Sequence, residues 1–318
     1  MNHALHPAPL PARKARRRVG ALSGFLAGSL FGLMAGLAPG AADAAAPQTQ
    51  ACPAPAATSA GSAGQHWASP AEANNDDKAP QPCASCAEPA NAGAGTCAVY
   101  RFLASAACAD GRCRDAQGEF VRRENGGDTF FLQHDTRFRD PIRFARARGE
   151  NCRVLLWAIE PVVGIEDVPG YSGRHYWQDA YVASQRMVEP PFAKDDVAFA
   201  IQPATTRGQH QFHIHIGTLK PDYRAALAAL PPDATHVRIG HYDFHARFIA
   251  VSAGANPFAG IDVLAIARSL MPRGAADLPL HGVLATVTEG GRGLWILTAP
   301  RFERSELNYV RPAECRLN

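Results

Sequence analysis

The feature that most constrains this chain is a stretch without charged residues, Val19 to Ala38, which directly follows a basic cluster. The cluster consists of Arg13, Lys14, Arg16, Arg17 and Arg18, and a run of small residues around 41–46 follows the stretch. Basic, apolar and small-residue segments in this order are typical of an export signal. About 20 uncharged residues can also span a bilayer as a helix. We therefore expect residues 1–46 to be a signal peptide or a membrane anchor, with the rest of the chain exported to the periplasm or the periplasmic face of a bacterial inner membrane.

The next segment, residues 47–95, is rich in Ala, Pro, Ser and Gly and has Trp67 as almost its only large apolar residue. Such a composition buries too little apolar surface to offset the entropy of ordering, so it predicts a disordered linker. Without residues 1–46, which hold five basic residues and Asp43, the formal net charge falls from +3 to −1. A nearly neutral exported part argues against nucleic acid as the main partner. Residues 96–318 remain as a single domain of ordinary size.

Eight cysteines fit an exported protein, because an even number in an oxidising compartment usually indicates disulfides. The pair Cys83 and Cys86 has a spacing also found in redox motifs and half zinc sites. No strand precedes this pair and no second matching pair exists, so a local disulfide, or none, is expected. The full set is Cys52, Cys83, Cys86, Cys97, Cys108, Cys113, Cys152 and Cys315.

The periodicity of apolar residues predicts an α+β fold over a largely antiparallel sheet, because helices and strands mix without strict alternation. Expected helices are Val99–Ala107, His175–Val188 and Pro221–Leu230. Expected strands are Asp128–Gln133, Arg153–Ile159, Val197–Gln202 and Gln211–Gly217, with a hairpin made by Val283–Thr288 and Leu294–Thr298.

The stretch Gln211–Gly217 carries the chemistry. In a strand, Phe212, Ile214 and Ile216 point to one face, while Gln211, His213 and His215 point to the other. Two neighbouring imidazoles suit phosphoryl chemistry, in which one attacks phosphorus and the other donates to phosphoryl oxygens or the leaving group. The same pattern also fits a solvated polar face, or a zinc site completed by His210, His241 or His245.

This stretch resembles the motif of the histidine triad superfamily, and more closely that of its bacterial membrane branch, the CDP-diacylglycerol pyrophosphatases. The motif reads Phe212-His213-Ile214-His215-Ile216 and is followed by Lys220-Pro221-Asp222. The resemblance extends from about Cys97 to the end of the chain. It implies a histidine-triad-like domain with flanking helices. Further matches, in the order of the family, are Gly164-Ile165-Glu166, Tyr176-Trp177, Val197–Gln202, Gly240-His241, Asn256-Pro257-Phe258 and Cys315.

The resemblance implies that His213 attacks the cytidine-side phosphorus, which forms a cytidylyl-histidine and releases phosphatidate before water frees CMP. His215 is expected to contact phosphate oxygens. Arg207 is a candidate phosphate ligand, because a guanidinium binds phosphate oxygens in pairs. No metal or cofactor is expected. Gln209 and His241 are further candidates for substrate contacts.

Two positions depart from the family pattern. Gln211 stands where the family has its first histidine, and Gln202 where it has an asparagine. Glutamine keeps a hydrogen bond but cannot shuttle a proton. His210 lies one residue early, and a bulge is needed to bring it to the site. Hydrolysis of CDP-diacylglycerol is thus the first hypothesis, hydrolysis of another nucleotide diphosphate ester the second, and a non-catalytic protein that binds metal or nucleotide the third.

Overall fold

The computed structural model describes residues 85–91, 93–115, 118–135, 150–167, 171, 173–252, 254–302, 307–308, 310–311 and 315–318. The predicted signal or anchor segment and most of the predicted linker, residues 47–84 and 92, lie outside these residues. Among the described residues, no helix has both the length and the apolar character that crossing a membrane requires.

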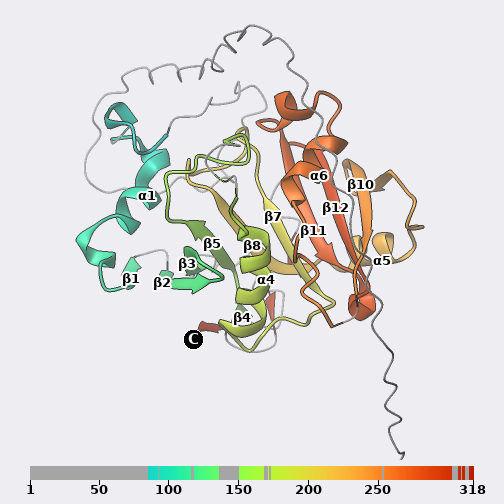
Figure 1. Cartoon of the computed structure of the whole chain (residues 1–318), viewed down its shortest axis with the longest axis horizontal. Helices are drawn as coiled ribbons and strands as arrows, with labels where there is room; N and C mark the ends of the chain where they lie inside the picture. Colours follow the sequence, from blue (N-terminus) through green and yellow to red (C-terminus); the bar gives the residue numbers. More distant parts are fainter. Residues whose placement is uncertain are drawn as a thin grey trace, which may run out of the picture. The chain divides into compact units, whose positions relative to one another are not determined.

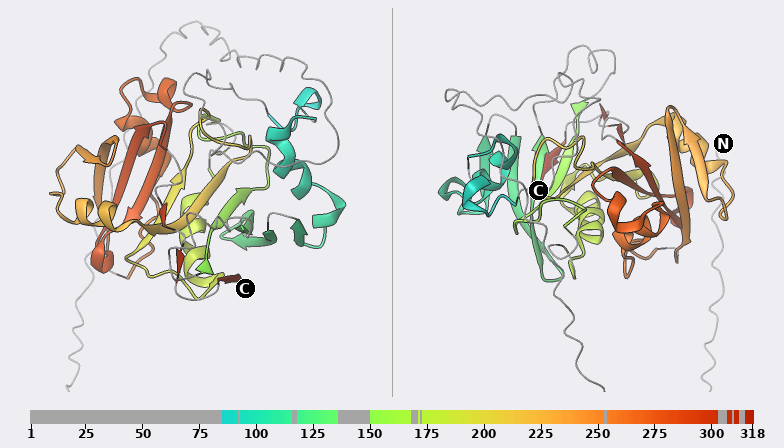
Figure 2. Two further views of the ribbon diagram at one scale, coloured as in Figure 1. Left: turned by 180° about the vertical axis from the view of Figure 1, so that it is seen from behind. Right: turned by 90° about the horizontal axis from the view of Figure 1, so that it is seen from above.

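One large antiparallel sheet organises the described part of the chain. Figures 1 and 2 show β1 near one edge of this sheet and the β9–β10 pair at the other. In spatial order the strands are β1 (Arg112–Asp115), β2 (Gly118–Asn125), β3 (Asp128–Asp135), β5 (Val154–Ala158), β8 (His213–Leu219), β7 (Val197–Ile201), β11 (His281–Val287), β12 (Gly293–Pro300), β10 (Tyr242–Ala250) and β9 (His236–Ile239). The short β13 (Leu307–Asn308) pairs with the end of β8.

Two small pairs lie outside this sheet: β4 (Glu150–Asn151) with β14 (Val310–Arg311), and β6 (Val188–Glu189) with β15 (Arg316–Leu317). The α-helices are α1 (Ala98–Leu103), α4 (Tyr176–Arg186), α5 (Pro221–Ala228) and α6 (Val263–Leu270). Short 3-10 turns are η2 (Pro89–Asn91), η3 (Gly95–Cys97), η4 (Ala106–Cys108), η5 (Gly274–Asp277) and η6 (Glu289–Gly291).

The prediction of an α+β fold with a largely antiparallel sheet is confirmed, and most predicted elements are present. The predicted helix from Val99 ends at Leu103 and is followed by the separate turn η4. The predicted strand from Gln211 begins only at His213. The hairpin β11–β12 turns through η6, where Gly290 and Gly291 have φ of 75° and 65°, values that glycine adopts readily.

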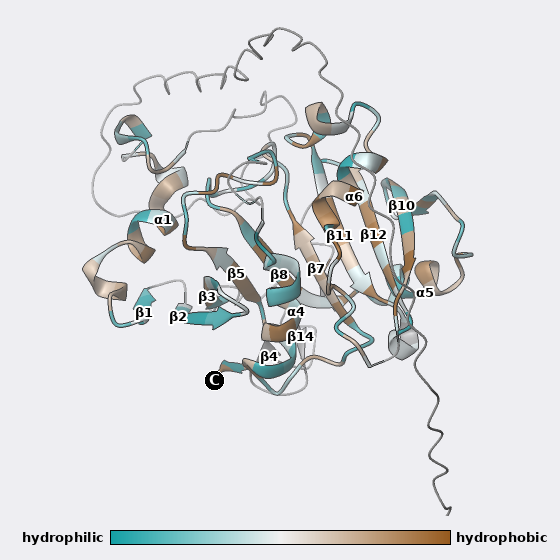
Figure 3. Ribbon diagram, viewed as in Figure 1, coloured by the Kyte–Doolittle hydropathy of each residue, from teal (hydrophilic) through white to brown (hydrophobic). Residues whose placement is uncertain are grey.

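Apolar residues cover both faces of the sheet. On one face, alternate residues such as Phe199, Ile214 and Ile216 form the largest core cluster together with α4 and α6. On the opposite face, a second cluster lies beneath α5 and a third lies beside α1. Figure 3 shows the apolar residues along β7 and β12, within this double-sided core. The centre of the sheet is therefore buried on both sides.

Candidate active site

The histidines of the motif lie on β8, in the interior of the sheet. His213 and His215 project from the face opposite Ile214 and Ile216, as the alternation predicted. They are not solvated, because His213 is 7% exposed and His215 is 0% exposed. Buried imidazoles lie in a low-dielectric environment, where interactions with charge are stronger than in water.

The strand register defines the neighbours of the two histidines. His213 lies opposite Trp157 of β5, and His215 lies opposite Leu155 of β5 and Ala200 of β7. Gln202 directly follows β7, which ends at Ile201. The Gln202 amide is buried and donates to the carbonyl oxygen of Thr206 at 3.2 Å, so it also holds the turn after β7.

The imidazole of His213 is held by a ring stack and a hydrogen bond. Its ring stacks on Trp157 with centroids 4.2 Å apart and an angle of 27° between the planes, and His215 approaches edge-on at 4.9 Å. Its Nδ1 lies 2.7 Å from the backbone oxygen of Gln211. A carbonyl oxygen only accepts, so Nδ1 carries the proton of this bond. In the neutral ring the lone pair is then on Nε2, which is the form a nucleophile requires.

The Gln211 side chain has a different role from an acid–base group. Its Nε2 donates to the backbone oxygens of Ala158 at 2.7 Å and Glu160 at 2.6 Å, which ties the start of the motif to the end of β5. The contact with His213 comes from the Gln211 backbone. That contact does not depend on which side chain occupies position 211.

Arg207 is held in a buried ion pair with Glu166. Nη1 of Arg207 donates to Oε2 of Glu166 at 2.7 Å, and Nη2 donates to Oε1. The two side chains are only 2% and 8% exposed. Burial raises the pKa of Glu166, but the charge and hydrogen bonds of Arg207 outweigh it and lower that pKa overall. Gly164 permits the pair, because a Cβ on Gly164 would lie 1.9 Å from Nη1.

This ion pair changes the interpretation of Arg207 and His210. The guanidinium expected to bind phosphate is neutralised by Glu166, and its Nε donates to Nδ1 of His210 at 3.2 Å. Burial and the Arg207 charge lower the pKa of His210 to about 4, so this ring is neutral at pH 7. Strand β8 starts after His210, and the ring of His210 is engaged by Arg207. Both residues lie in residues 203–212, the segment that leads into β8, and they help to hold it; it is called the lead-in segment below.

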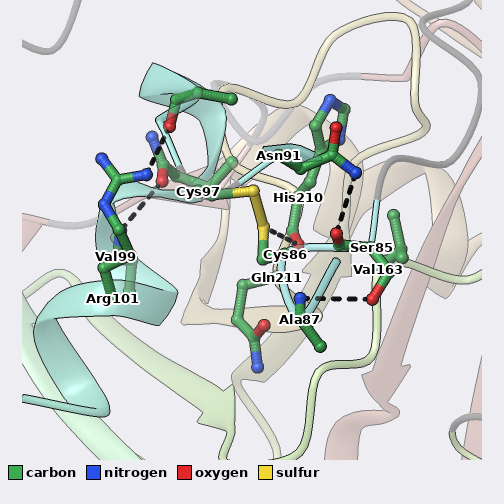
Figure 4. Close-up of a disulfide and its surroundings, with 12 residues drawn as sticks. Ser85, Cys86, Ala87, Asn91, Cys97, Val99, Arg101, Val163, His210 and Gln211 are labelled. Carbon is green, nitrogen blue, oxygen red and sulfur yellow. Dashed lines mark hydrogen bonds between the residues drawn. A yellow bond between two sulfur atoms is a disulfide. The ribbon is translucent and has the colours of Figure 1, made fainter. Parts of the chain in front are cut away.

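A disulfide-containing segment clamps the same lead-in segment (Figure 4). The Gln209 side chain accepts from Val99 N at 3.1 Å and donates to Gly95 O at 3.3 Å. The His210 backbone N donates to Thr96 O at 2.7 Å. The disulfide sulfur of Cys86 lies 3.2 Å from the backbone oxygen of His210. Gln209, expected to contact substrate, thus anchors the lead-in segment.

The prediction of disulfides is confirmed, and of the two alternatives for Cys83 and Cys86 the structure shows no bond between them. Cys86 bonds to Cys97, whereas Cys83 lies outside the described residues, as does Cys52. The pairing follows from the turn η3, which brings Cys97 back beside Cys86. The other two bonds are Cys108–Cys113 and Cys152–Cys315.

The structure does not bring His241 to the motif. His241 is exposed in the turn between β9 and β10 and packs on Tyr242 at 4.0 Å between centroids. Strands β7, β11 and β12 separate β10 from β8, so a phosphate contact by His241 is not supported. His245 instead pairs with His236 across the two strands, at 4.5 Å. Within the described residues, no three His, Cys, Asp or Glu side chains gather to hold a metal, so the alternative of a zinc site completed by His210, His241 or His245 has no support there.

Sequence reasoning gave no role to Trp157 and found Glu166 only through the resemblance. Trp157 was placed in a strand, but its contact with His213 depends on the pairing of β5 with β8. Its Nε1 donates to Oε1 of Gln133 on β3 at 2.9 Å, which adds a second buried residue to the site. Only long-range pairing reveals these partners.

Two comparisons relate the chain to known proteins. A family model described as CDP-diacylglycerol pyrophosphatase matches residues 138–310, which include the motif and its lead-in segment. A CDP-diacylglycerol pyrophosphatase from Yersinia pestis is 35% identical over 100 residues, or 29% of this chain. The aligned region spans 39% of the length of that relative.

Proposed function

The chain belongs to the CDP-diacylglycerol pyrophosphatase family, and we propose that it hydrolyses CDP-diacylglycerol to CMP and phosphatidate in phospholipid metabolism. The observation that carries the proposal is the buried His213 imidazole, whose Nδ1 is bound by the Gln211 carbonyl. This bond places the lone pair on Nε2 and fixes the direction of the ring. A histidine prepared in this way is suited to nucleophilic attack on phosphorus.

In the first step, the Nε2 lone pair of His213 forms a bond to the cytidine-side phosphorus. The bond from that phosphorus to the bridging oxygen breaks, and phosphatidate leaves with the electron pair and then takes up a proton from water. In the second step, water attacks the phosphorus and releases CMP and a proton. The P–N bond breaks, and its electrons return to Nε2. His215, 4.9 Å from His213 between ring centroids, is the proposed donor to the phosphoryl oxygens.

The replacement of the first histidine by Gln211 is compatible with this chemistry. The group that orients His213 is a backbone oxygen, and glutamine supplies it as well as histidine does. The Gln211 side chain fixes that backbone through Ala158 and Glu160. Departure from the family motif therefore leaves the orientation of the nucleophile intact and removes only a titratable side chain.

The proposed setting is the periplasmic side of a bacterial membrane, with residues 1–46 as the signal or anchor. The basic cluster next to Val19–Ala38 and the disulfides support this setting, because both are typical of exported chains. The lipid substrate lies in the membrane, so a tether of this kind keeps the domain close to it.

The activity test uses the purified full chain in detergent micelles with CDP-diacylglycerol, and CMP is followed by chromatography. We expect CMP from the wild type and from His245→Ala, and a loss of at least about 1,000-fold in His213→Ala, because a nucleophile has no substitute. Equal rates for His213→Ala and the wild type would contradict the nucleophile assignment. Faster turnover of water-soluble adenosine or uridine diphosphate esters would instead favour the second hypothesis on substrate.

A further inference from the structure

Trp157 holds a position that the hydrolysis mechanism above leaves unused. It lies directly opposite His213 in the antiparallel pair β5–β8, and its indole stacks on the imidazole at 4.2 Å between centroids with 27° between the planes. The indole is 2% exposed and the imidazole 7%, so little water screens the two rings from each other. An indole face carries partial negative charge and attracts cations placed over it.

The charge on His213 changes during the proposed reaction. Before attack, the ring is neutral, with its proton on Nδ1 and its lone pair on Nε2. When Nε2 bonds to phosphorus while Nδ1 keeps its proton, the ring becomes an N-phosphoryl imidazolium with a positive charge. The group opposite this ring therefore faces a neutral imidazole in the ground state and a cation in the intermediate. An interaction that grows along this path lowers the barrier.

The indole is itself held in place by a hydrogen bond. Its Nε1 donates to Oε1 of Gln133 at 2.9 Å, and Gln133 is fully buried on β3. An indole N–H only donates, so the amide must present its oxygen here. When the indole N–H donates a hydrogen bond, electron density shifts toward the ring. This polarisation strengthens the interaction of the ring face with a cation. Gln133 thus fixes the plane of the indole and increases its attraction for a cation.

We propose that Trp157 is a positioning and charge-stabilising residue, which favours the cationic form of the His213 imidazole through its π face, with Gln133 holding the indole. The catalytic part of this inference rests on the proposed function, in which His213 is the nucleophile. Among the described residues, His215 is a titratable neighbour of the same ring, in a T-shaped contact at 4.9 Å between centroids.

The test separates ring charge from packing by placing fluorinated tryptophans at position 157 of the full chain. Fluorine withdraws electron density from the indole face with little change in volume, so packing is preserved. From tryptophan to tetrafluorotryptophan we expect kcat for CMP release to fall in steps by roughly 3- to 30-fold, with KM changed by less than about twofold. The matched control is the same series at Trp295, which is also 2% exposed but lies on β12.

A second readout needs no turnover. Nuclear magnetic resonance of labelled histidine follows the titration of the His213 ring, which is assigned with His213→Gln. We expect its midpoint to move to lower pH with each fluorine at Trp157 and to stay fixed in the Trp295 series. A flat series in both kcat and midpoint would overturn the proposal for Trp157. A midpoint that moves in steps while no cytidylyl adduct forms would support the effect of Trp157 on the ring and would refute the proposed function alone.

Discussion

Gly164 has no room for a side chain, because the Arg207–Glu166 ion pair lies against its Cα. Gly164→Ala forces the pair apart, and we expect the free energy of unfolding to fall by about 1–3 kcal/mol, the usual cost of overpacking a buried site. Urea denaturation followed by tryptophan fluorescence measures this change. Gly208→Ala is the matched control, since nothing lies within 4 Å of its added Cβ. Equal stability of the two variants would contradict the close packing of Gly164 on the ion pair.

The neighbouring His210 predicts a pH dependence of stability. Its pKa is lowered from 6.5 to about 4 in the folded protein by burial and by Arg207. Between these pH values the unfolded chain binds a proton that the folded chain does not, so stability falls as the pH drops through this window. The lowered pKa of Glu166 acts in the same direction in more acidic solution, because its contribution is lost as the carboxylate becomes protonated.

Between pH 7 and pH 4, we expect the unfolding free energy to decrease less in His210→Gln than in the wild type. The two decreases should differ by at most about 3 kcal/mol. The glutamine oxygen still accepts from Arg207, so the variant keeps the bond and loses the titration. Unfolding in urea at several pH values measures it, with His241→Gln, an exposed residue of the β9–β10 turn, as the control. A wild-type slope in His210→Gln would show that His210 is not the responsible group.

At the scale of elements, the segment around η3 and α1 holds the lead-in to β8, although it lies outside the residues that match the family model. Removal of the Cys86–Cys97 bond by a double Cys→Ser change loosens this clamp. The bond closes a loop of 11 residues, and its loss costs about 3 kcal/mol in the loop-entropy model. We expect amide hydrogen exchange in the segment 203–212 to accelerate by at least about 10-fold.

Hydrogen exchange with mass spectrometry detects this loosening, and the double Cys→Ser change at Cys108 and Cys113 is the control. That bond closes a loop between η4 and β1, away from the lead-in segment. If both variants exchange alike in 203–212, the clamp by the Cys86–Cys97 segment is disproved. The Cys86–Cys97 segment lies outside the residues that the family model covers, because the match begins only at residue 138.

Local patterns were enough to predict the elements whose residues carry their own signal. Alternation placed β8, and Pro221 predicted the start of α5. The hairpin β1–β2, the edge strand β9 and its neighbour β10 were missed, although β2 and β10 are eight and nine residues long and alternate buried with more exposed residues over part of their length. Helix α6 was missed as well, although Asp262 caps it by accepting from Ala265 N at 2.9 Å.

The candidate site was predicted only in part for a related reason. His213 and His215 are adjacent on one strand, so the period of two was enough to place them on one face. Arg207 was predicted as a phosphate ligand, but in the structure its guanidinium is held by Glu166, which lies 41 positions away in the sequence. The stack of Trp157 on His213 depends on strand pairing, and His241 was misassigned because sequence order does not reveal the strands that lie between.

For the whole molecule, the part after residue 46 is nearly neutral, so charge attraction over the whole surface does not explain recognition of the proposed anionic substrate. We propose that recognition depends on the residues around His213 on β8. The fold supports this, since core clusters cover both faces around β8 and hold its histidines in fixed directions.

The most direct test of this account is to quench the full chain early in its reaction with CDP-diacylglycerol and determine the mass of the protein and of its peptides. The account predicts a cytidylyl group on the peptide that contains β8, assigned to His213 by fragmentation, and its disappearance as CMP accumulates. His213→Ala should form no adduct. CMP released without any adduct at early times, or an adduct on another residue, would contradict the account.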